Sequence, residues 1–126
     1  MSDLAVFQIG HDRARWLAAR VAVVAANVAN ADTPGYRAKD IAPFGSILNE
    51  ARIEMRKSQA GHLAPEQDME ARFGVGPREG AVQKHSGNSV SLEAEMAALG
   101  EAKEQQSAVT AILGVFHRML LSSSRG

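Results

Sequence analysis

Proline is confined to the middle of this chain, and that distribution limits where long helices can form. The four prolines are Pro34, Pro43, Pro65 and Pro77, in a stretch that also holds most of the glycines. Proline ends or kinks a helix, because it lacks an amide hydrogen and clashes with the preceding turn. The sequence therefore predicts a mainly α fold: long helices within 1–37 and 89–126 form a coiled-coil layer, and 38–88 is an irregular middle in which short strands can form.

The first segment carries an apolar stripe at helical spacing. Its positions follow a heptad pattern: Phe7, Ala14, Leu17, Val21, Val24 and Val28. This pattern is typical of a helix whose seam packs on another helix. Thr33 should lie outside the helix, because a following proline disfavours the α conformation. Pro34 and Gly35 then suit the central positions of a type II turn.

The last segment carries a second apolar ladder, which starts after Ser91, a favourable N-cap residue. Its steps of three or four residues are broken only near Gln106, and its members are Leu92, Met96, Leu99, Ala102, Val109, Leu113, Phe116 and Leu120. Glu93 and Glu95 place negative charge in the first turns, where the helix dipole favours it. Together with Glu101 and Glu104, they are expected to form a charged face, solvated or between subunits.

The middle segment has weaker signals. Apolar spacing predicts a short amphipathic helix from Phe44 to about Met55. Residues 69–73 and 81–84 are candidate short strands, and residues 74–77 between them are predicted to form a turn.

Two such helices bury only one narrow stripe each when they pair. A chain of 126 residues with few large apolar residues in its middle buries a modest share of its surface. We therefore expect the isolated chain to be marginally ordered, and the apolar residues of both helices to serve as subunit packing positions.

The end of the first helix carries the most informative stretch of the sequence. It comprises Asn27, Asn30, Asp32, Thr33, Pro34, Gly35 and Tyr36. Asparagine is a poor residue inside a helix, because its amide competes with backbone hydrogen bonds. Two of them in the last turns therefore predict defined hydrogen bonds. On its physical chemistry alone, the stretch is most simply a helix end followed by an exit turn.

This stretch also resembles a known family. Residues 25–33 are similar to the signature shared by flagellar rod and hook proteins, and residues 34–40 with Phe44 resemble the FlgB family of proximal rod proteins in particular. Residues 87–96 are similar to the start of that family's last helix. The neighbouring proximal rod protein FlgC and the ring-to-rod adaptor are the alternatives within the same machinery.

The resemblance implies a structural subunit without catalytic residues, cofactor or metal. Such proteins leave the cell through the flagellar export apparatus without a cleaved signal, and polymerise helically in the periplasm. The proximal rod links the MS-ring protein, through an adaptor, to the other rod proteins and transmits torque. The implied partners are therefore copies of the chain itself and these components, with the terminal helices in the inner layer of the rod.

Composition argues against several other classes of function. The 14 basic and 14 acidic residues leave no net charge, which argues against nucleic acid and anionic membrane surfaces as partners. No apolar run is long enough for direct membrane insertion. Cysteine is absent, and the four histidines lack metal-ligand spacing. A wall-cutting enzyme would need paired carboxylates that no motif marks, so a cytoplasmic coiled-coil adaptor is the other main alternative.

Overall fold

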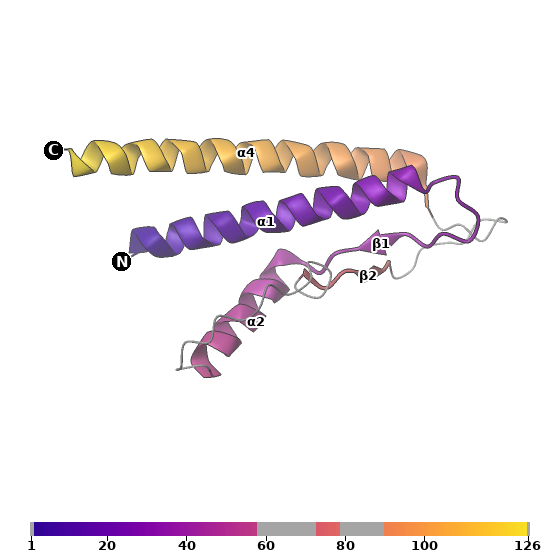
Figure 1. The fold of residues 1–126 in the computed structure, drawn as a ribbon, viewed down its shortest axis with the longest axis horizontal. Coiled ribbons are helices and arrows are strands. Elements are labelled where there is room, and N and C mark those ends of the chain that lie inside the picture. The colour runs from indigo at the N-terminus through magenta and orange to yellow at the C-terminus, as the bar shows by residue number, and fades with distance from the viewer. Residues whose placement is uncertain (1, 58–72, 79–89, 126) are drawn as a thin grey trace.

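The computed structural model describes residues 2–57, 73–78 and 90–125, and within them the fold is mainly α, as predicted. Helix α1 spans Ser2–Ala29, α2 spans Phe44–Lys57 and α4 spans Leu92–Ser124. Two short strands, β1 at Lys39–Asp40 and β2 at Gly76–Pro77, complete the described elements. Figure 1 shows α1 and α4 side by side, with both termini at the same end of the molecule. The two long helices are therefore antiparallel.

The helix pair is long and thin. At about 1.5 Å per residue, the 28 residues of α1 and the 33 of α4 extend roughly 42 and 50 Å. Phe7 of α1 meets Phe116 of α4 edge to face, with ring centroids 5.7 Å apart. Gly10 lies under Leu113, so closely that a Cβ on Gly10 would stand 2.6 Å from the Leu113 Cδ2 atom. Glycine at this position allows the two helices to approach.

The predicted exit turn is confirmed. The Tyr36 amide donates to the Thr33 carbonyl over 3.2 Å, and Gly35 has a φ of 77°, as the third position of a type II turn requires. The chain then runs back along α1 and forms β1 (Figure 1).

The middle segment differs in part from the prediction. Helix α2 is found where it was expected, but Gly76 and Pro77, predicted as turn residues, pair antiparallel with Asp40 and Lys39. Proline is compatible with this position because it lies on an edge strand. Its missing amide hydrogen therefore does not remove a hydrogen bond from the strand pair. The candidate strands at 69–73 and 81–84 lie outside the described residues, except for Phe73, which is buried and belongs to neither strand.

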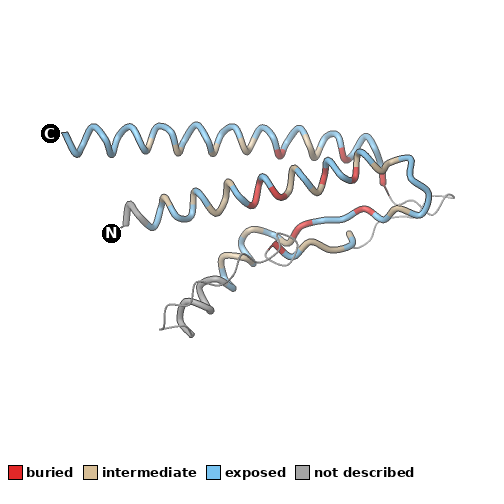
Figure 2. The backbone as a smooth tube through the Cα atoms, viewed as in Figure 1, coloured by how far each residue is buried: buried red, intermediate tan, exposed pale blue. Residues whose placement is uncertain are grey.

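A small apolar core lies where α1 meets the middle segment. Its members are Trp16, Leu17, Ala19, Ile41 and Phe73. The indole nitrogen of Trp16 donates to the Ala42 carbonyl over 2.8 Å, so the ring is both packed and hydrogen-bonded. In Figure 2 the buried residues concentrate in the part of the molecule where α1 faces α4 or the middle segment, and most of α4 is exposed. None of the helices described is apolar enough over a sufficient length to span a membrane.

Candidate functional site

The predicted seam of α1 is buried unevenly. Leu17 and Val24 are fully or almost fully buried, whereas Phe7, Ala14, Val21 and Val28 are half-buried. The prediction omitted Trp16 and Ala19, which are buried on the side of α1 that faces the middle segment. A single tryptophan on a helix otherwise rich in alanine was the available signal for this second contact face.

On α4, the residues that face α1 coincide only in part with the predicted ladder. Val109, Leu113 and Phe116 are half-buried beside α1, and Leu99 is also half-buried, but Leu92, Met96 and Leu120 are 44%, 59% and 37% exposed. The buried residues of the helix are Glu95 and Ala102. The first turns of α4 therefore face α1 with a carboxylate and a small residue, and the larger apolar side chains lie outside that contact.

Asn27 lies at the centre of a buried polar junction. Its side chain is fully buried, and its Nδ2 donates to the Lys39 carbonyl over 2.8 Å and to the Glu95 carboxylate over 3.1 Å. Its Oδ1 accepts from the Lys39 amide over 3.0 Å and from the Tyr36 hydroxyl over 3.3 Å. One side chain thus joins the end of α1 to the exit turn, to β1 and to α4.

Glu95 extends this junction to β2. The expectation that Glu95 belongs to a solvated or inter-subunit charged face is wrong, because its side chain is fully buried. Its carboxylate accepts a hydrogen bond from the guanidinium of Arg78, which also lies 3.6 Å from Asp40. The hydrogen bond to Glu95 raises the pKa of Arg78, against the opposing effect of burial, and the charges of Glu95 and Asp40 add to the rise. Since Arg78 stays cationic, the buried carboxylate has a permanent counter-charge.

Asn30 acts locally, unlike Asn27. Its Nδ2 donates to the Ala26 carbonyl over 2.8 Å, and its Oδ1 accepts from the Thr33 hydroxyl over 3.2 Å. These bonds satisfy groups at the end of its own helix, and they are defined hydrogen bonds of the kind that the sequence predicts for this residue. Asp32, Thr33, Pro34 and Gly35 are exposed, and Tyr36 is half-buried.

Two surfaces of the helix pair remain uncovered in the single chain. Among the described residues, the exposed large apolar side chains are Val6, Ile9, Leu92, Met96, Ile112, Val115, Met119, Leu120 and Leu121. A face of small residues on α1 is also exposed and comprises Ala18, Ala22, Ala25 and Ala29. We refer to these sets as the apolar surface and the alanine face.

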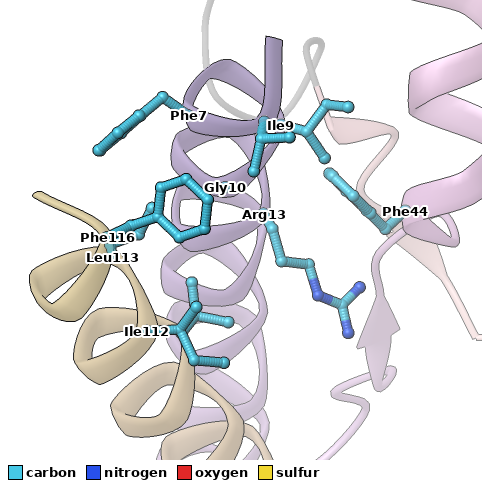
Figure 3. Close-up of a pocket in the computed structure, with 10 residues that line it drawn as sticks. Phe7, Ile9, Gly10, Arg13, Phe44, Ile112, Leu113 and Phe116 are labelled. Atoms are coloured by element: carbon cyan, nitrogen blue, oxygen red, sulfur yellow. The ribbon is translucent and has the colours of Figure 1, made fainter. Parts of the chain in front are cut away.

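An apolar groove continues the apolar surface between the helices. It encloses about 360 Å³ and is lined by side chains of α1, α4 and α2. Figure 3 shows Phe7, Ile9, Phe44, Ile112 and Phe116 around it, with Arg13 as its charged side chain. The Arg13 guanidinium lies 4.6 Å from the Trp16 ring centroid and donates to Gln105 over 3.3 Å.

The chemistry of these surfaces favours helix docking. They offer apolar side chains, and alanines that allow another helix to approach closely. Within the described residues, no group of three or more acidic or histidine side chains is arranged to hold a metal ion. The buried side-chain nitrogen and oxygen atoms are all hydrogen-bonded within the described part of the chain.

Known proteins of the flagellar basal body are similar in sequence to this chain. The family model described as "Flagella basal body rod protein" matches residues 13–37, which hold the buried half of α1, Asn27 and the exit turn. The flagellar basal body rod protein FlgB of Agrobacterium fabrum is 34% identical over 128 residues, which cover 96% of this chain and 93% of the relative. FlgB of Salmonella typhimurium is 48% identical over 44 residues, or 35% of this chain and 31% of that protein.

Proposed function

The chain belongs to the FlgB family of flagellar basal-body rod proteins, and we propose that it builds the proximal part of the rod. The family gives it a structural role in the basal body. In the proposal, copies of the chain polymerise helically in the periplasm, link the MS ring to the distal rod through neighbouring components, and transmit torque to the rest of the flagellum.

The observation that carries this proposal is the combination of an ordered junction with uncovered apolar helices. At one end of the pair, Asn27 and Glu95 tie α1, α4 and the strands together. Along α4, by contrast, side chains such as Ile112, Val115 and Met119 are 62%, 47% and 62% exposed. Contiguous exposed apolar surface of this kind marks protein–protein contacts in soluble proteins. A helical polymer buries it through head-to-tail contacts between identical chains.

The proposal assigns different roles to the predicted packing residues. Leu17, Val24, Val109, Leu113 and Phe116 hold the helix pair of one chain together. Leu92, Met96 and Leu120 are free of that contact and suit packing against neighbouring subunits. Residues 1–37 and 89–126 then form the inner rod layer, and residues 38–88 lie outside it.

The proposed route to the rod is export by the flagellar apparatus without a cleaved signal. A chain without cysteine suits such a route, because it cannot form disulfides that would oppose threading in an unfolded state. The proposed partners are copies of itself, the other rod proteins, the MS-ring protein and the ring-to-rod adaptor.

The test places variant chains in an in-frame deletion strain and measures swimming and export. Met119→Glu places a charge on the apolar surface, away from the buried junction. We expect it to be exported but to give no motility, whereas Lys103→Gln, an exposed polar exchange on the same helix, should swim normally. Normal swimming by Met119→Glu would remove this part of α4 from the proposed contact.

A further inference from the structure

The apolar face of α4 does not by itself define one register on α1. If α4 slid by four residues, Val109 would take the place of Leu113, and Ile112 that of Phe116. Ala98 would take the place of Ala102, so this layer would stay unchanged. Gly10, which receives Leu113, offers a notch that a smaller valine would also enter. Gln105, however, would take the place of Val109, which packs against the apolar core, so the shifted register keeps an apolar or small residue at three of these positions and loses one apolar contact.

The buried polar junction also distinguishes the two registers. In the observed register Glu95 faces Asn27, and in the shifted one Ser91 would stand there. Four residues correspond to about 6 Å along the axis. At that displacement the Glu95 carboxylate would be out of reach of the Asn27 amide, and a short hydroxyl would replace a carboxylate beside Arg78.

We infer that the buried contact between Glu95 and Asn27 sets the register of α4 on α1, and that Arg78 extends the same selection to β2. A polar pair inside an apolar helix interface selects register because every other alignment leaves a buried polar group unpaired. In the shifted register two groups would be affected, because Asn27 and Arg78 would both lose the Glu95 carboxylate as their acceptor on α4. The inference concerns the fold of the single chain, and it holds whichever part of the rod the chain builds.

The location of the junction fits this role. Asn27 is held from the other side by both backbone groups of Lys39, so its amide is fixed in orientation before α4 docks. Arg78 is positioned by its own amide, which donates to the Ala38 carbonyl over 2.9 Å. Both groups that recognise Glu95 therefore belong to the α1–β1–β2 unit, and Glu95 is the acceptor that α4 contributes.

A distance measurement between spin labels tests the inference directly. The chain has no cysteine, so Gln8→Cys on α1 and Lys103→Cys on α4 give two labelling sites, both exposed. The two sites are offset along the pair, and sliding by four residues changes their separation by several ångströms. Pulsed electron paramagnetic resonance on the full-length labelled chain, diluted with unlabelled chain in a stabilising osmolyte, measures the distribution.

The comparison uses three residues of similar size at position 95. The unaltered Glu95 chain and Glu95→Gln should each give one distance, because the glutamine oxygen can still accept from Asn27. Glu95→Met keeps the volume but not the acceptor, and the share of the shifted distance should rise about tenfold. If Glu95→Met alone is poorly helical, the double variant Glu95→Met with Arg78→Met is measured instead. It removes both charges and restores a packed interface.

The outcomes separate clearly. A second distance in the methionine variants, with one distance in Glu95→Gln, supports Glu95 as the register-setting residue. A single native distance in a helical methionine variant would overturn the inference and assign register to the apolar contacts and to Val90, which is fully buried just before α4. A distribution in Glu95→Gln as broad as in Glu95→Met would also contradict it.

Discussion

At the scale of single residues, the two asparagines of the motif have different functions. Asn30 bonds within four residues of itself, whereas Asn27 reaches Lys39, 12 residues on, and Glu95, 68 residues on. The sequence identified both as residues with defined hydrogen bonds. It could not identify the partners of Asn27, because those partners are brought there by the tertiary fold.

Asn27→Leu should destabilise the chain by about 2–4 kcal/mol, because it leaves the Lys39 backbone groups and Glu95 without their partner in a buried site. Urea unfolding followed by circular dichroism in a stabilising osmolyte measures this. The matched control is Asn30→Ala, whose bonds are exposed and whose loss should cost at most about 1 kcal/mol. Equal effects of the two variants would contradict the special position of Asn27.

Gly10 has a specific steric role in the packing of α1 against α4. Gly10→Ala should cost about 1–3 kcal/mol, because the new Cβ would stand 2.6 Å from Leu113 and push the helices apart. Gly100→Ala and Gly114→Ala are the controls, since nothing lies within 4 Å of a Cβ there, and each should stabilise the helix by up to about 1 kcal/mol. Leu113→Ala in the Gly10→Ala chain should recover part of the loss. A stabilising Gly10→Ala would mean that the helices do not approach at this point.

At the scale of elements, the helices were predictable and the strands were not. The proline distribution and the apolar spacing located α1, α2 and α4, because a helix many turns long repeats its signal. Strands β1 and β2 have two residues each, too few for an alternating pattern. The burial of Glu95 was missed for another reason: an acidic residue in the first turn of a helix is equally favourable when it is solvated.

Helix α1 offers a test in which two adjacent positions separate folding from assembly. Val24→Asp places a charge at a position only 3% exposed, so the isolated chain should lose helix content and the emission of buried Trp16 should move to longer wavelength. Ala25→Asp lies on the exposed alanine face and should leave both signals unchanged. Loss of folding in both variants would show that the face of α1 was assigned wrongly.

A swimming assay of Ala25→Asp provides a second test, which concerns the alanine face. If neighbouring subunits pack on it, Ala25→Asp should abolish swimming although the chain folds, because a charge would enter a close helix contact. A serine at this position, in Ala25→Ser, should be tolerated as the size-matched control. Full motility of Ala25→Asp would exclude the alanine face from the subunit contacts.

At the scale of the whole molecule, the chain resembles one layer of a larger assembly. Its core is small, most of α4 is exposed (Figure 2), and the exposed residues of α4 include large apolar side chains. The predicted packing residues divide between the contact within the chain and the exposed surface. This division could not be read from the sequence, since both sets have the same apolar chemistry and the same helical spacing.

Electron microscopy of basal bodies from an in-frame deletion strain tests the central claim most directly. If the chain builds the proximal rod, the MS ring should be retained while the rod and hook are lost, and the unaltered gene should restore both, together with swimming. Basal bodies with complete rods and hooks in the deletion strain, confirmed to carry no second copy of the gene, would contradict the assignment of this chain to the proximal rod.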